Sequence, residues 1–168
     1  FALLLLFAVF AICFIIGAVV VINTKEVKLF DVGNNHAVYV KYGDVFSGEL
    51  ISNNQYKHRN ILVSVNRCFD TIVDDNLISR NTLHGAAINK IIKDKPYKIK
   101  KLDSEIQSQL EAKHYKQLEH DQKPAGKLKR YDEGTVVEIT AGNATYFLLG
   151  LTCFDEKLHP YITDEEYI

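Results

Sequence analysis

The first 22 residues restrict this chain more than any other feature, because all of them except Gly17 are apolar. As an α-helix such a run would be about 33 Å long, which matches the roughly 30 Å hydrocarbon core of a bilayer. A signal peptide has a shorter apolar region that ends at a small-residue cleavage site. A buried helix of a soluble domain is the other alternative, but the rest of the chain is too short to surround a helix that is apolar all round. We therefore expect residues 1–24 to form a transmembrane helix.

The flanks of this segment indicate its orientation. Lys25 and Lys28 follow it, and the positive-inside rule then favours a cytoplasmic C-terminal part at the inner membrane of the cell. The sequence begins with Phe1 and contains no methionine. We therefore expect a further stretch of chain before it.

The remainder has the composition of a soluble domain. Its 20 Lys and Arg and 21 Asp and Glu give a net charge of −1, which argues against nucleic-acid binding by bulk attraction. Cys13, Cys68 and Cys153 form no CxxC pair, and the six histidines show no metal-ligand spacing. We expect free thiols and no metal site.

Alternating and apolar runs predict a mixed α/β domain over residues 25–168. Residues 26–41 have the period of a β-hairpin. The apolar run 61–65 fits a strand covered on both faces, as in a parallel sheet. Residues 135–140 and 144–152 read as two further strands, joined by a turn at Gly142 and Asn143.

Two helices are expected, at residues 86–92 and 102–120. For the second, Ser104 and Gln107 could form a capping box, with Asp103 as a rival N-cap. Residues 47–59 are polar and predict a loop or short helix. A capping box at residues 163–166 starts a helix that has no body, so we expect the domain to continue beyond Ile168.

The first candidate site consists of Gly43, Asp44 and Val45, directly after the predicted hairpin. Glycine allows the backbone to approach a ligand closely, and an aspartate there can accept a hydrogen bond from an exocyclic amine such as that of adenine. The alternative is structural: Asp44 would cap a turn or short helix.

The second candidate site follows the apolar strand. Asn66 lies at its carboxyl end, where α/β sheets bind ligands, and its amide offers both a donor and an acceptor. Phe69, Asp70 and Thr71 follow and could supply an aromatic wall and backbone amides. A simple cap after a strand is the alternative.

The third candidate site is His84 and Gly85, at the start of the first predicted helix of the domain. A glycine there would leave N–H groups free to bind a phosphate, helped by the helix dipole. A lone histidine is more often structural, and no serine, cysteine or aspartate is spaced to form a triad with it.

These three sites, in this order, resemble the macro domain, an ADP-ribose-binding module. More narrowly, residues 65–85 (VNRCFDTIVDDNLISRNTLHG) and 133–139 (EGTVVEI) look like the divergent macro domain of Thoeris anti-phage defence effectors. The resemblance implies an α/β fold in which residues 25–168 form a three-layer α/β/α domain with a mixed sheet, incomplete at its C-terminus. It also implies that the preceding transmembrane helix is the last of two.

The resemblance assigns a role to each candidate. Asp44, flanked by Gly43 and Val45, would bind adenine, and Asn66 would lie near the distal ribose. The pocket would be lined by Phe69, Asp70 and Thr71, and the diphosphate would be bracketed by His84 and Gly85. Two departures from the family pattern weigh against ADP-ribosyl hydrolysis: the second asparagine of the V-N-x-x-N motif and the Gly-Gly phosphate loop are both replaced. The second phosphate loop would lie beyond Ile168.

The resemblance further implies a receptor, not an enzyme, and no cofactor. Its ligand would be a nucleotide-derived messenger, an ADP-ribose derivative such as histidine–ADP-ribose, made by a TIR-domain enzyme that consumes NAD. Binding would lead to homo-oligomers that disrupt the lipid bilayer. One alternative is a membrane-tethered ADP-ribosyl hydrolase that uses Asp70 or His84, and another is an anchored scaffold without a ligand.

Overall fold

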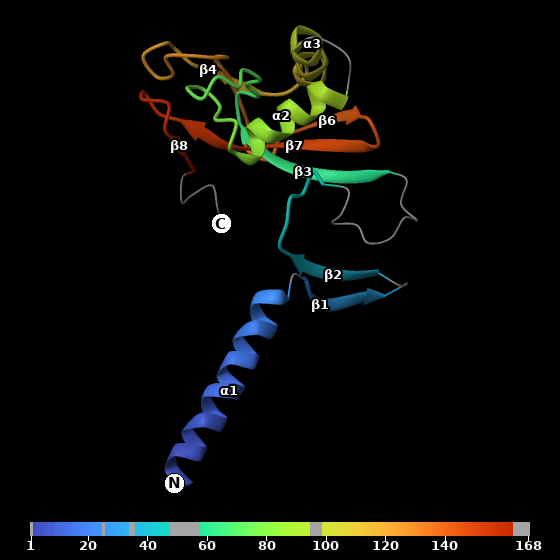
Figure 1. Cartoon of the computed structure of the whole chain (residues 1–168). Coiled ribbons are helices and arrows are strands. Elements are labelled where there is room, and N and C mark those ends of the chain that lie inside the picture. Colours follow the sequence, from blue (N-terminus) through green and yellow to red (C-terminus); the bar gives the residue numbers. More distant parts are fainter. Residues whose placement is uncertain (1, 25, 34–35, 48–57, 95–98, 163–168) are drawn as a thin grey trace. The chain divides into compact units, whose positions relative to one another are not determined.

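The computed structural model describes residues 2–24, 26–33, 36–47, 58–94 and 99–162. They fall into two compact units, Phe1–Ser52 and Asn53–Ile168, whose elements are labelled in Figure 1. The division between the units thus lies within residues 25–168, which were expected to form one domain. A domain boundary after residue 24 stays a prediction.

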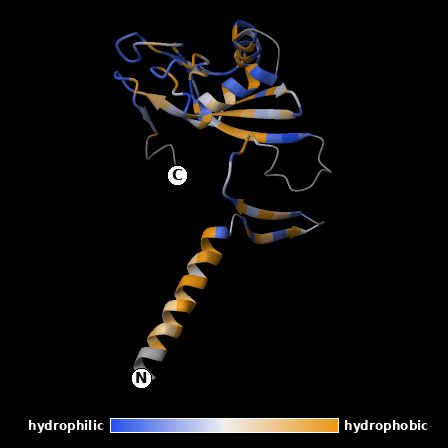
Figure 2. Cartoon of the chain, in the orientation of Figure 1, coloured by the Kyte–Doolittle hydropathy of each residue, from blue (hydrophilic) through white to orange (hydrophobic). Residues whose placement is uncertain are grey.

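The first unit begins with helix α1, Ala2–Asn23. Its ribbon is coloured mostly as hydrophobic up to the polar residues at its C-terminal end (Figure 2). Polar side chains bind the last carbonyls: Asn23 Nδ2 donates to Val19 O and Thr24 Oγ1 donates to Val20 O, both at 2.8 Å. By length and composition α1 is able to cross a membrane, so the predicted apolar helix is confirmed.

Strands β1 (Glu26–Gly33) and β2 (His36–Lys41) form the predicted antiparallel hairpin. Its register is interrupted twice, between Lys28 and Phe30 and between Asp31 and Gly33. Such bulges increase the local twist of the ladder.

The second unit is built on a mixed sheet, as predicted. Strand β3 (Arg59–Asn66) pairs in parallel with β7 (Ala144–Phe154), which pairs antiparallel with β6 (Val136–Ala141). The β6–β7 turn contains Gly142 at φ +58°, which confirms the predicted Gly-Asn hairpin. A short strand, β8 (Pro160–Tyr161), pairs with the end of β7.

Helices α2 (Leu83–Asp94) and α3 (Ile99–Leu110) lie over the same face of this sheet (Figure 1). The core fills the space between helices and sheet, and its buried members include Ile61, Val63, Val65, Ile88, Ile91, Leu102, Ile106, Val137, Ile139, Tyr146 and Leu148.

The expectation that residues 61–65 are covered on both faces is wrong. Leu62, which points away from the helices, is 62% exposed. Strand β3 is an outer strand of the described sheet, and no described helix of this unit covers its second face. The third layer implied by the resemblance is therefore not seen among the described residues.

The predicted helix over residues 102–120 is wrong in its second half. Helix α3 begins earlier, at Ile99, and ends at Leu110, and Tyr115–Gln117 forms strand β4 against β5, Lys129–Tyr131. The ring of Tyr115 lies 5.8 Å from that of Tyr131 and under Lys129 Nζ. This pairing with a segment distant in sequence overrides the local helical pattern.

The predicted caps of that helix are also wrong, because α3 begins at Ile99 and Asp103 and Ser104 therefore lie inside it. Asp103 Oδ1 accepts a hydrogen bond from Thr71 Oγ1 at 2.6 Å, and Ser104 Oγ donates to Lys100 O at 3.0 Å. Most of the predicted loop 47–59, and all of the capping box at 163–166, lie outside the described residues.

Candidate functional site

A cavity of about 300 Å³ opens in the second unit at the carboxyl end of β3. It is enclosed by the end of β3, by the loop that leads into α2, and by the segment from the end of β7 to β8. Its lining residues are Ser64, Val65, Asn66, Asp75, Asn76, Leu77, Ile78, Ser79, Thr82, Leu83, His84, Thr152, Phe154, Leu158 and Pro160. Of the predicted site residues, the cavity brings together Asn66 and His84.

Asn66 is 2% exposed, and the oxygen and the nitrogen of its side-chain amide have different roles. Its Oδ1 accepts hydrogen bonds from the backbone N–H groups of Cys68 (3.1 Å) and Asp70 (3.3 Å), which fixes the loop after β3. Its Nδ2 has no hydrogen-bond partner among the described residues. A buried donor without a partner is costly, which makes Asn66, a residue of the cavity lining, a candidate for contact with a bound molecule.

His84 is the second polar group of the cavity, in the first turn of α2. Its Nε2 lies 3.0 Å from Asp70 O. A carbonyl oxygen can only accept, so Nε2 carries the proton and Nδ1 is an acceptor in the neutral ring. The pKa of His84 is lowered to about 4, mainly by burial and also by the charge of Lys127, against the raising effect of the hydrogen bond to Asp70 O.

Close packing explains why position 85 is a glycine. Helix α2 starts earlier than predicted, with Thr82 as N-cap: Thr82 Oγ1 accepts a hydrogen bond from Gly85 N at 3.1 Å. That N–H is therefore already bonded, and is not free for a phosphate as the sequence suggested. A Cβ at position 85 would lie 2.2 Å from Ser79 O, so only glycine fits against this turn of the loop.

Phe69 and Thr71 do not line this cavity. Phe69 is 1% exposed and packs its ring edge-on against Tyr131 at 5.8 Å, with φ +52°. Thr71, also buried, holds Asp103 of α3 through its hydroxyl. Both side chains therefore hold the loop after β3 against neighbouring elements, β5 and α3, and their contact with a ligand stays a prediction.

Asp70 belongs to a buried polar cluster beside the cavity. Its Oδ2 lies 3.0 Å from Lys123 Nζ, and both side chains are 1% exposed. Asp70 Oδ1 accepts from Lys127 N at 2.7 Å, and Lys123 Nζ donates to Ala125 O and Lys127 O. Removing one member of such a pair typically costs about 3–5 kcal/mol, so Asp70 anchors the loop 123–127 to the loop after β3.

The apolar wall of the cavity was not predicted from the sequence. Leu77 and Ile78 lie in a loop organised by Asp74, whose Oδ1 accepts from the N–H groups of Asn76 (3.0 Å) and Leu77 (2.7 Å). These hydrogen bonds lower the pKa of Asp74. A D-D-N stretch does signal a turn, but nothing local shows that its apolar residues face a pocket.

Gly43, Asp44 and Val45 lie in the first unit, after β2. Asp44 Oδ1 accepts from Phe46 N at 2.9 Å and Asp44 O accepts from Ser47 N at 3.0 Å. This is the turn-capping arrangement named above as the structural alternative. The contact of these three residues with a ligand stays a prediction.

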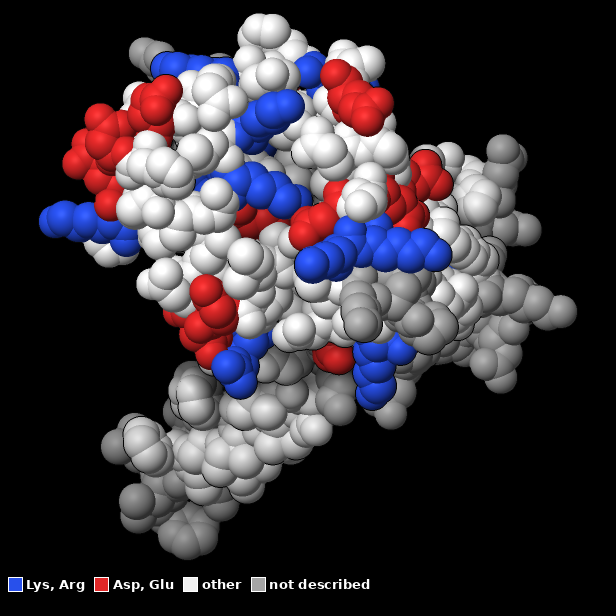
Figure 3. Space-filling model, turned by 90° about the horizontal axis from the view of Figure 1, so that it is seen from above, with Lys and Arg blue, Asp and Glu red and all other residues white. Residues whose placement is uncertain are grey.

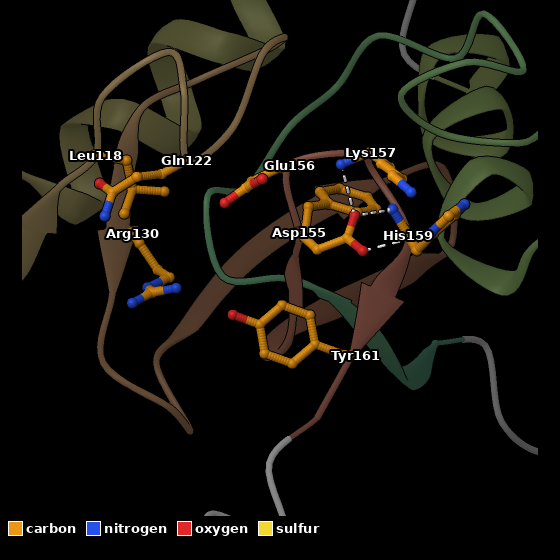
Figure 4. Close-up of a pocket in the computed structure, with 9 residues that line it drawn as sticks. Leu118, Gln122, Arg130, Asp155, Glu156, Lys157, His159 and Tyr161 are labelled. Atoms are coloured by element: carbon orange, nitrogen blue, oxygen red, sulfur yellow. Dashed lines mark hydrogen bonds and ion pairs between the residues drawn. The ribbon is translucent and has the colours of Figure 1, made fainter.

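A second hollow, of about 500 Å³, shares Phe154 with the lining of the first cavity and is drawn in Figure 4. Arg130 from β5 and Tyr161 from β8 border it, and Asp155 holds its loop by accepting from the N–H groups of Lys157 and His159 at 2.8 Å. Basic and acidic side chains alternate over the face seen in Figure 3. The described residues contain no group of three His, Cys, Asp or Glu side chains that could hold a metal.

All three cysteines are free. Burial raises the pKa of the Cys68 thiol to about 12, against the lowering effect of Lys123. A thiol with so high a pKa is not ionised at neutral pH. Cys68, next to the site, therefore acts as a small core residue.

Comparison with known proteins agrees with this architecture. A family model described as "Thoeris protein ThsA, Macro domain" matches residues 38–168. Thoeris protein ThsA from Bacillus amyloliquefaciens (strain Y2) is 29% identical over 134 residues, covering 80% of this chain and 40% of that protein. This chain thus spans less than half of the length of that relative. Because the family model covers most of the chain, including the whole cavity, the chain belongs to the Thoeris ThsA macro domain family.

Proposed function

We propose that this Thoeris defence protein uses its macro domain to sense an ADP-ribose-derived signal at a membrane. The family match establishes a macro domain of the ThsA type, and the apolar helix α1 supplies a candidate anchor. The expected ligand is histidine–ADP-ribose, made from NAD by a TIR-domain enzyme. The anchor would lie in the inner membrane, with the macro domain in the cytoplasm.

The observation that carries this proposal is the unpartnered Nδ2 of Asn66. It is a buried donor at the carboxyl end of a strand, and His84, whose Nδ1 is an acceptor in the neutral ring, lines the same cavity. A sugar hydroxyl can accept from the first and donate to the second. The apolar side chains around them suit the carbon faces of a ribose or a heterocycle, as in other small-molecule sites.

A receptor must convert binding into a change of state. The ligand has to bind the clustered form more tightly than the resting form, because a ligand with equal affinity for both shifts nothing. We propose homo-oligomers that disrupt the bilayer as the active form.

The geometry favours binding over hydrolysis. Hydrolysis of an ADP-ribosyl bond needs a base placed beside the reacting water. Asp70 is held in its ion pair with Lys123, and His84 Nε2 is bonded to Asp70 O. The low pKa of His84 makes its remaining nitrogen a weak base.

The test is calorimetric titration of the full chain in lipid nanodiscs with histidine–ADP-ribose, ADP-ribose, cyclic ADP-ribose and NAD. We expect binding of histidine–ADP-ribose. In Asn66→Asp the carboxylate keeps the two loop hydrogen bonds but loses the donor, so affinity should fall about tenfold or more. Asn60→Asp, at an exposed position of the same strand, is the matched control and should bind normally.

Two results would contradict the proposal. One is the absence of binding of all four compounds to a folded chain. The other is an unchanged affinity in Asn66→Asp. Release of free ADP-ribose from a conjugate would instead support the hydrolase alternative.

A further inference from the structure

The β1–β2 hairpin has two unlike faces. Side chains alternate along a strand, so Val38 and Val40 of β2 share one face. The register places Val27 opposite Val40 and Phe30 opposite Val38, with the bulge at Leu29 between them. One face therefore consists of Val27, Phe30, Val38 and Val40, which we call the apolar hairpin face.

The opposite face is polar and neutralises its own charges. Lys41 Nζ lies 2.6 Å from Glu26 Oε2, and Lys28 Nζ lies 2.6 Å from Asp31 Oδ1. Lys41 Nζ also lies 5.5 Å from the centre of the Tyr39 ring. Two lysines and two acids leave this face without net charge, so it suits water and needs no oppositely charged partner.

Three of the four residues of the apolar hairpin face are exposed: Val27 by 51%, Phe30 by 57% and Val40 by 57%. Val38 is half-buried. A two-stranded hairpin alone is at best marginally stable in water, and a contiguous apolar surface of this kind normally has a partner.

The chain connection indicates the partner. Helix α1 ends at Asn23 and β1 begins at Glu26. Three Cα–Cα steps of 3.8 Å cover at most about 11 Å, and each interfacial layer of a bilayer is roughly 5–8 Å thick. If α1 spans the membrane, the hairpin starts at the lipid surface and cannot move far from it.

We propose that the hairpin lies on the bilayer with its apolar face buried at the boundary between headgroups and acyl chains. The polar face then points to water. This inference rests on the membrane anchor of the proposed function. Because the polar face carries no net charge, attachment should not depend on anionic lipid.

Tryptophan quenching tests this directly, because the chain has no native tryptophan. The full chain is placed in nanodiscs of neutral phosphatidylcholine, with or without bromine on the acyl chains. Phe30→Trp and Val40→Trp report the apolar hairpin face, Tyr39→Trp is the matched control on the polar face, and Phe14→Trp reports α1. We expect bromine to quench Phe30→Trp and Val40→Trp at least twofold more than Tyr39→Trp, with blue-shifted emission.

The outcomes distinguish the hairpin inference from the proposal that α1 anchors the chain in the membrane. Quenching of Phe14→Trp without quenching of Phe30→Trp and Val40→Trp would overturn the hairpin inference and leave the anchor intact. Absence of quenching in Phe14→Trp would overturn the anchor itself. Blue-shifted but unquenched tryptophans on the apolar hairpin face would mean that protein covers it, which also overturns the inference. The two reporter positions are independent, so one variant that fails to fold does not end the test.

Discussion

Asn66 holds the fold through one end of its amide, and we propose that the other end binds a ligand. Its Oδ1 closes the loop after β3 by accepting from two backbone N–H groups, while its Nδ2 is left without a described partner. Aspartate would keep the first role and lose the second, and alanine would lose both. Comparing these two substitutions therefore distinguishes a structural defect from a binding defect.

His84 makes the free energy of unfolding depend on pH. Its pKa is about 4 in the folded chain, below the ordinary 6.5, mainly because burial disfavours the charged ring. Below pH 6.5 the unfolded chain therefore binds a proton before the folded chain does. The contribution of His84 to the free energy of unfolding is constant above pH 6.5 and falls as the pH drops from 6.5 towards 4.

Urea unfolding of the full chain between pH 7.5 and 4.5 measures this. Wild type should lose stability relative to His84→Gln over that interval, because glutamine does not titrate and the other groups cancel in the difference. Parallel stability curves for the two proteins would contradict the burial argument.

At the level of elements, the start of α2 depends on close contact with the preceding loop. A Cβ at Gly85 would meet Ser79 O at 2.2 Å. In an exposed helix position glycine to alanine gains up to about 1 kcal/mol, but Gly85→Ala should instead destabilise, by about 1–3 kcal/mol, since backbone must move.

Asn89→Ala, at an exposed position of the same helix, is the matched control and should be neutral or slightly stabilising. Thermal unfolding of both variants gives the comparison. A stabilised Gly85→Ala would show that α2 and the loop separate easily.

The elements also show what local sequence can and cannot predict. The hairpin, β3, β6 and β7 were predictable because alternation and a Gly-Asn turn are local signals. The end of α3 was not predictable, because Tyr115 pairs with Tyr131 of β5. The two residues are 16 positions apart, so the local helical period gives no sign of this pairing. The exposed face of β3 was missed because a short apolar run looks the same whether one face or both are covered.

The residues of the candidate site were likewise only partly predictable from the sequence. That Asn66 and His84 line the cavity agrees with the sequence, because a polar residue after a buried strand and a histidine at a helix start are local signals. Their contact with a ligand stays a prediction. Phe69 instead packs into the core, and Gly85 serves packing against Ser79. Leu77 and Ile78 were missed because only the folded loop turns them towards the cavity.

For the whole molecule, the proposed membrane anchoring by α1 and the proposed ligand binding should be separable, because the cavity lies entirely in the second unit. Helix α1 contains 15 Leu, Ile, Phe and Val residues, worth about 5–9 kcal/mol of insertion free energy at 0.3–0.6 kcal/mol each. A lysine near the centre costs about 2.5–3.5 kcal/mol. One lysine should therefore be tolerated, whereas three should abolish insertion.

We expect Ile12→Lys to remain in the membrane fraction after alkaline carbonate extraction, and the triple variant Phe10→Lys, Ile12→Lys, Phe14→Lys to be released. The same three positions changed to leucine provide the control, which should stay in the membrane. The released triple variant should still bind histidine–ADP-ribose with wild-type affinity, since none of its changes touches the cavity. Loss of that affinity would mean that the pocket needs the membrane to form, and retention of the triple-lysine chain in the membrane would show that something other than α1 anchors it.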